Sequence, residues 1–215
     1  MMLLLVPDGP FLIKGTKFNS RALILIFQSK GVRSASLGYF GHMWELYGLL
    51  AFIPVLLADY VATNPGISLN IPFWSFCIMA GGCIGCAGGG MISSKIGSAT
   101  VAFIQLAASG ICCLFSPLFA YAPAPLFLGI VIFWGCTAAG DSPQFSALVA
   151  KTAPPALVGS ALTIVNCIGF SLTIVSIQLL SALSAYINHS YMFLFLSVGP
   201  MLGLASLWPL VCSER

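Results

Sequence analysis

Long, uninterrupted apolar runs dominate the pattern of this chain. Each run is close to the ~20 residues that an α-helix needs to cross the ~30 Å hydrocarbon core of a bilayer. The runs cover 37–57, 72–91, 99–121, 126–149, 158–185 and 191–211. Barrel strands would instead alternate polar and apolar residues in units of ~10. The pattern therefore predicts an all-α polytopic membrane protein with six transmembrane helices.

The breaks between the runs carry turn-forming residues, such as Asn64-Pro65-Gly66 and Pro123-Ala124-Pro125. Composition agrees with a membrane environment: 59% of the 215 residues are apolar and 6% are charged, whereas soluble domains carry about 25% charged residues. We expect the lipid bilayer to surround most of this surface, because a helix satisfies its own backbone groups there.

The basic residues indicate how the chain is oriented. Five of them precede the first run, and Lys95, Lys151 and Arg215 fall in the second loop, the fourth loop and the tail. The first, third and fifth loops contain no Lys or Arg. By the positive-inside rule, both termini are predicted to be cytoplasmic in a multi-pass protein of the cell (inner or plasma) membrane. This topology accounts for the net charge of +3, so no nucleic-acid partner is expected.

The chain divides into three parts. Residues 1–36 are predicted to be a cytoplasmic or interfacial segment, formed by the end of a preceding helix and a central loop. Within this segment, 14–33 is basic around an apolar centre, which suits either a helix at the membrane surface or a plain linker. Residues 37–212 form the six-helix membrane domain, and 213–215 form a cytoplasmic tail.

Ionisable residues inside membrane spans are costly and usually face a bundle interior or a wet cavity. His42 and Glu45 in the first span lie three residues apart, so they share a helix face. That face also carries glycines, which let another helix approach closely; they are Gly38, Gly41 and Gly48. We expect the face to point inward. One alternative is that His42 and Glu45 only satisfy each other.

The fourth span carries Asp141 on one face with Trp134, Thr137, Gln144 and Phe145. Pro143 lacks a backbone donor, so the helix should bend or open nearby. Asp141 and Glu45 both lie ~12 Å inside the cytoplasmic ends of their spans. At that depth burial disfavours the charged form of a carboxyl group, which suits proton coupling. For Asp141 the alternative is a capping role at the bent helix.

A polar stripe runs along the fifth span and either packs against another helix or lines a pathway. It consists of Gly159, Asn166, Gly169, Thr173 and Ser176, with Thr163 at its edge. Gln144, Asn166, Thr163 and Thr173 are candidate cavity-lining residues. The eight cysteines lie in or beside apolar runs, where packing is the expected role. We expect neither a metal nor a cofactor.

Several segments resemble bacterial transporters of the major facilitator superfamily. Leu37-Gly38-Tyr39-Phe40-Gly41-His42-Met43-Trp44-Glu45-Leu46-Tyr47 is similar to the start of their seventh helix. Residues 141–149 resemble their tenth helix, and 158–163 followed by 169–173 resemble their eleventh. Pro7-Asp8-Gly9-Pro10 resembles the segment after their sixth helix. The resemblance implies that the chain is the C-terminal half of a twelve-helix fold, built as two inverted three-helix repeats. The first and fourth spans, with an acidic residue behind a glycine, agree with such repeats.

The superfamily's loop motif is present in weakened form between the second and third spans. Gly90, Lys95 and Gly97 match it, whereas Ser94 and Ser98 replace its acidic and last basic residue. In the family the acidic residue helps to latch neighbouring helices, so the latch is in doubt here.

The resulting functional prediction is transport of a small solute by alternating access, as half of a proton-coupled secondary transporter. Glu45, Asp141 and His42 are the predicted coupling residues. An isolated half should leave the faces of Glu45, Asp141 and Asn166 without partners, so we expect it to need an N-terminal six-helix half or a second copy. The alternative is a non-transporting membrane fragment or assembly subunit. An enzyme is not expected, since the sequence has no metal-ligand cluster, nucleophile elbow or phosphate loop.

Overall fold

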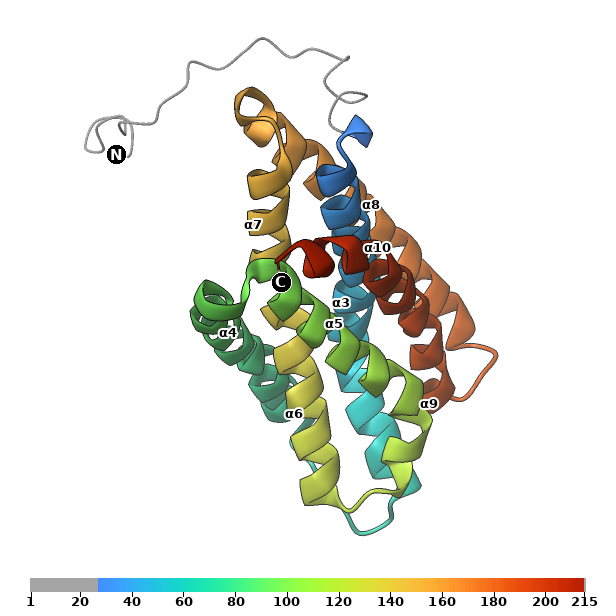
Figure 1. The fold of residues 1–215 in the computed structure, drawn as a ribbon. Helices are drawn as coiled ribbons and strands as arrows, with labels where there is room; N and C mark the ends of the chain where they lie inside the picture. Colours follow the sequence, from blue (N-terminus) through green and yellow to red (C-terminus); the bar gives the residue numbers. More distant parts are fainter. Residues whose placement is uncertain (1–26, 215) are drawn as a thin grey trace, which may run out of the picture.

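The computed structural model describes residues 27–214; Arg215 and the part of the predicted interfacial segment before residue 27 lie outside the described residues. The described chain is a bundle of helices that run up and down its long axis (Figure 1). Its main helices are α3 (Lys30–Thr63), α4 (Ile71–Ile96), α5 (Ser98–Phe115), α6 (Ala124–Gly140), α7 (Ser142–Thr152), α8 (Val158–Leu183) and α10 (Val198–Glu214). The short elements are α9 (His189–Met192) and the 3₁₀ helices η1 (Ser116–Tyr121), η2 (Pro155–Leu157) and η3 (Phe193–Ser197).

Six stretches of helix in the described chain are long and apolar enough to cross a membrane, which confirms the predicted number of spans. They are Lys30–Thr63, Ile71–Ile96, Ser98–Tyr121, Ala124–Thr152, Pro155–Leu183 and Phe193–Glu214. The first of them begins about two turns earlier than predicted. Val32 and Ala35 in these added turns are fully buried, so this part of the predicted interfacial segment belongs to the bundle.

Local chemistry sets the ends of several helices. The side chain of Asn70 accepts a hydrogen bond from the backbone N–H of Phe73 at 3.1 Å and so caps the start of α4. Gly97 joins α4 to α5 with a φ of 90°, a conformation that favours glycine. The second span can therefore turn directly into the third.

The helices pack in a pattern that places α3 and the α6–α7 pair at the centre. α3 packs against α8, α10 and α7, while the α6–α7 pair packs against α4 and α5 as well as α3. α5 also packs against α10. The second and fifth spans are the least covered: 28% and 22% of their most apolar stretches are buried, against 39–50% in the other four spans.

Two crossings depend on glycines that bring backbones into contact. On α3, a Cβ atom at Gly41 would collide with the carbonyl oxygen of Gly199 on α10. On α4, a Cβ atom at Gly85 would collide with the carbonyl oxygen of Cys136 on α6. Small residues at helix crossings are typical of membrane bundles. The first crossing confirms that the glycine face of the first span admits another helix.

The basic residues of the described chain gather at one end of the bundle. Lys30 and Arg33 lie in the first turn of α3, whose Gly31 adjoins Thr152 at the end of α7. Lys151 in the same turn of α7 lies 3.5 Å from Glu214, which contacts the Gly97 turn next to Lys95. The opposite end is closed by bonds such as Tyr60 Oη to the carbonyl oxygen of Ala122 at 2.7 Å.

Candidate functional site

The fourth span is interrupted at its acidic residue. α6 ends at Gly140, Asp141 forms a turn with φ −82° and ψ −15°, and α7 begins at Ser142. Pro143 occupies the first turn of α7, where a missing N–H is tolerated. The predicted opening of the helix near Pro143 is therefore confirmed. The Asp141 side chain makes no capping hydrogen bond to α7, so the capping alternative is wrong.

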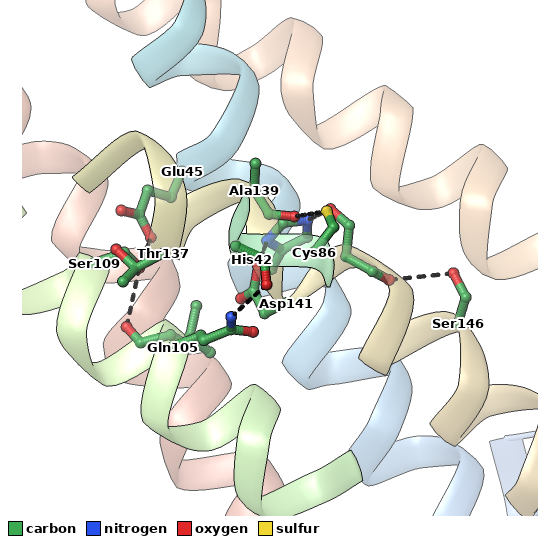
Figure 2. A network of polar contacts seen from close by, with 12 residues as sticks. His42, Glu45, Cys86, Gln105, Ser109, Thr137, Ala139, Asp141 and Ser146 are labelled. Carbon is green, nitrogen blue, oxygen red and sulfur yellow. Dashed lines mark hydrogen bonds and ion pairs between the residues drawn. The ribbon is translucent and has the colours of Figure 1, made fainter. Parts of the chain in front are cut away.

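Asp141 and His42 lie together inside the bundle, exposed by 0% and 1% (Figure 2). His42 Nδ1 on α3 is 2.9 Å from Asp141 Oδ1. The alignment of this short contact does not meet that of a hydrogen bond, and Asp141 Oδ2 has no hydrogen-bond partner among the described residues. Burying such an oxygen costs free energy unless a proton or another donor satisfies it. Asp141 Oδ2 is therefore a position where a proton could bind.

The other ring nitrogen of His42 contacts a residue nearer the surface of the bundle. His42 Nε2 lies 2.8 Å from Ser142 Oγ, and Ser142 is only half-buried. Ser142, His42 and Asp141 thus form a chain of three proton-carrying groups from the surface of the bundle to its interior. An imidazole can pass a proton because one nitrogen donates while the other accepts.

A chain of Ser, His and Asp also occurs in serine hydrolases, where it serves acyl transfer. In a nucleophile elbow, the residue after the serine contributes its backbone N–H to the oxyanion hole. Here that residue is Pro143, which has no N–H. The arrangement therefore suits proton movement better than acyl transfer.

Glu45 is also buried, with 1% of its surface exposed, but its surroundings differ from those of Asp141. Its Oε2 accepts from Ser109 Oγ at 2.8 Å. Its Oε1 accepts from Trp134 Nε1 at 2.9 Å and from Cys113 Sγ at 3.3 Å. Figure 2 shows Glu45 beside Ser109, whereas His42 and Asp141 lie together next to Cys86. The suggestion that His42 and Glu45 only satisfy each other is wrong, since each has other partners.

The expectation that the faces of Glu45 and Asp141 are left uncovered without another half is wrong, since both side chains are buried. The bundle's own helices cover both, because α5, α6 and α7 close over the inward face of α3. The broader expectation, that His42 and Glu45 point inward, is confirmed.

Further polar groups surround Asp141 that sequence reasoning missed. Gln105 on α5 donates from Nε2 to the carbonyl oxygen of Gly85 at 3.1 Å, and its buried Oε1 has no partner among the described residues. Cys86 donates from Sγ to the carbonyl oxygen of Ala139 at 3.3 Å. In the sequence these residues are isolated side chains within apolar runs. Many membrane helices contain such residues, so their position near Asp141 could not be predicted.

The candidate cavity-lining residues do not form one group. Gln144 and Thr173 are buried, Asn166 is half-buried, and Thr163 is exposed. Thr173 donates to the carbonyl oxygen of Phe170 on its own helix at 2.7 Å. Its neighbour Gly169 packs so closely on Tyr39 of α3 that a Cβ atom would lie 2.6 Å from the ring. The part of the stripe around Gly169 thus packs against α3, whereas Asn166 and Thr163 keep exposed surface.

The weakened loop motif lies beside an acidic group from elsewhere in the chain. Gly90 and Lys95 are exposed near the end of α4, and Gly97 forms the turn into α5. Glu214 at the end of α10 accepts hydrogen bonds through Oε2 from the backbone N–H groups of Ala99 at 2.9 Å and Thr100 at 3.2 Å. A carboxylate suits the N-terminus of a helix because of the helix dipole.

No family model matches the chain, and comparison with curated proteins and with solved structures also finds no match. The resemblance of 37–47 and 141–149 to major facilitator transporters therefore stays a prediction.

Proposed function

We propose that this chain is one six-helix half of a proton-coupled secondary transporter of the major facilitator type, and that Asp141 carries the coupled proton. The observation that supports this most is the Ser142–His42–Asp141 chain, which links a half-buried hydroxyl to a buried carboxyl group with one unfilled oxygen. Ionisable groups inside membrane spans commonly belong to ion pathways and proton relays.

The packing of the helices supports two three-helix repeats. If the first, second and third spans correspond to the fourth, fifth and sixth, the contact between α3 and α8 corresponds to the contact between α6 and α4. The contact between α3 and α10 likewise corresponds to the contact of the α6–α7 pair with α5, and the α5–α10 contact corresponds to itself. Inverted repeats of this kind are common in secondary transporters.

The partner half would cover α4 and α8, which are the least buried spans. It is either an N-terminal six-helix bundle or a second copy of this chain. The solute would then bind between the halves, facing Ser142 and the edge of α8. With the basic end of the bundle in the cytoplasm, both termini are cytoplasmic and the protein resides in the cell (inner or plasma) membrane.

Proton uptake and helix movement are linked through the break at Asp141. When a proton reaches Oδ2, the free energy cost of an unpaired charge at this position is removed. His42 contacts both Asp141 and Ser142, the last residue before α7 and its first residue. A change in charge on Asp141 therefore alters the contact that holds the start of α7 against α3. Movement of α7 about the break would open or close one side of the solute site.

Infrared difference spectroscopy of the reconstituted protein tests this proposal without knowledge of the solute. Asp141→Asn should remove a protonated carboxyl band from the wild-type spectrum. In heavy water, Ser142→Ala should slow deuteration of that band, because the outer end of the relay is lost. Ser146→Ala is the matched control, since Ser146 lies one turn along α7 and donates to the carbonyl oxygen of Ser142 rather than to His42. Identical spectra for the wild type and Asp141→Asn would contradict the proposal.

A further inference from the structure

The two buried carboxylates differ in how many donors they have. Glu45 has three donors, which come from the hydroxyl of Ser109, the thiol of Cys113 and the indole of Trp134. An ionised carboxylate offers about four acceptor positions, so Glu45 is nearly saturated. Asp141 has one short contact with His42 through Oδ1, and its Oδ2 has no hydrogen-bond partner in the described part of the chain. A further hydrogen-bond donor stabilises a carboxylate little when its acceptor positions are already filled. It stabilises a buried carboxylate with an unsatisfied oxygen much more.

Trp134 depends on Glu45 more than the other two donors do. The indole N–H can only donate, the side chain is fully buried, and Glu45 Oε1 is the acceptor 2.9 Å away. Ser109 has a second acceptor in reach, the carbonyl oxygen of Leu106 at 3.1 Å. Loss of the Glu45 acceptor would therefore leave the indole N–H unsatisfied in the core.

Glu45–Trp134 and His42–Asp141 are two contacts between the same pair of spans. Glu45 and His42 lie three residues apart on one face of α3, and Trp134 and Asp141 lie seven apart, which returns to one face after two helical turns. The Glu45–Trp134 bond ties α6 to α3, in addition to the packing of α6 on α4 and α5. The last turn of α6 leads directly into Asp141, so this bond contributes to where Asp141 meets His42.

We infer that Glu45 is a positioning residue, which holds α6 through Trp134 so that Asp141 meets His42, and that it is not a proton-coupling residue. This inference rests on the proposed function. It also separates two carboxylates that the sequence analysis grouped in one role. Ser109 and Cys113 of α5 and Trp134 of α6 donate to Glu45. The titratable groups that interact with it electrostatically are Cys112 and Cys113 of α5 and Asp141 between α6 and α7.

Three substitutions at Glu45 and Trp134 separate positioning from coupling. Glu45→Gln keeps an oxygen for Trp134 and Cys113, while its amide can donate to Ser109, whose hydroxyl turns to Leu106. Glu45→Met has a similar length but offers no oxygen acceptor to the indole. Trp134→Phe removes the donor itself, and it replaces Glu45→Met if that variant does not fold. Asp141→Asn is the reference for loss of the coupling group.

The readout is the Asp141 band, obtained by subtracting the Asp141→Asn spectrum and followed over pH. We expect Glu45→Gln to leave the deuteration rate as in the wild type. Glu45→Met removes the same carboxyl group, but compared with Glu45→Gln it should shift the half-amplitude by about one pH unit, a tenfold change in proton affinity, because Asp141 no longer meets His42 in the same position. A general loss of stability would lower the folded fraction without moving this pH.

The results also distinguish the inference from the proposed function. If Glu45→Gln removed the band, or if Glu45→Met and Trp134→Phe both folded and kept the half-amplitudes of Glu45→Gln and of the wild type respectively, the positioning role would be wrong while Asp141 could still couple. If instead the Asp141→Asn spectrum matched that of the wild type, the proposed function would fail, and the positioning role would fail with it.

Discussion

Replacing Gly85 with alanine should destabilise the bundle at the α4–α6 crossing. A Cβ atom at Gly85 would collide with the carbonyl oxygen of Cys136, and it would lie 2.8 Å from the carbonyl carbon of Cys136 and 3.2 Å from the Cα of Gly140. All three atoms belong to the backbone of α6, so no side chain can rotate out of the way. Carbon atoms settle at contacts of ~3.5–4.0 Å, so α6 would have to move by roughly an ångström.

Gly88 on the same helix provides the matched control, since a Cβ atom there meets nothing within 4 Å among residues 27–214. Alanine is a better helix former than glycine by about 1 kcal/mol, and both substitutions gain this amount. The difference between them isolates the cost of overpacking, which is typically about 1–3 kcal/mol. We therefore expect Gly85→Ala to be less stable than Gly88→Ala by about 1–3 kcal/mol.

Unfolding by sodium dodecyl sulfate in mixed micelles, followed by tryptophan fluorescence, would measure both free energies of unfolding. Gly85→Ala should also alter the infrared band of Asp141, because the displaced turn of α6 leads into that residue, whereas Gly88→Ala should not. Equal free energies of unfolding for the two variants would show that α4 and α6 do not cross at Gly85 as described.

Two further predictions concern the ends of the bundle. Glu214→Ala should lower the free energy of unfolding more than Lys151→Ala does in the same assay. Glu214→Ala removes the cap of α5, worth about 0.5–2 kcal/mol. Lys151→Ala removes an ion pair with an exposed lysine, worth at most about 1 kcal/mol. The reverse order would refute the capping role of Glu214. Reporter fusions at Gly66, Ala124 and Asn188 should lie outside the cell, because the basic residues mark the opposite end as cytoplasmic; a cytoplasmic signal at any two of these sites would overturn the topology.

The spans and their inward faces could be predicted because the bilayer imposes them. A helix must be long and apolar to cross the bilayer, and it must turn groups such as His42 and Glu45 away from lipid. The break at Asp141 could be predicted for a similar reason, since Pro143 cannot continue a helix without losing a hydrogen bond. These are local constraints that are visible in one segment at a time.

The pairing between helices could not be predicted in this way. Nothing in the first span indicates that His42 contacts Asp141 and Ser142 while Glu45, one turn away, contacts Trp134. The donors to Glu45 include Cys113, which composition alone marks as a packing residue. The expectation that the face of Asp141 is uncovered failed because the break lets α7 pack along α3, so the bundle covers its own carboxylates.

The most direct test of the central claim is solute-linked proton movement across proteoliposomes that contain the purified chain, with the mass of the assembly measured in the same sample. We expect proton movement only where the mass corresponds to two six-helix units, either two copies of this chain or this chain with an N-terminal bundle. Asp141→Asn should abolish this movement without changing the mass. Robust proton-driven uptake by a stable 22.6 kDa monomer, or by the Asp141→Asn variant, would contradict the claim.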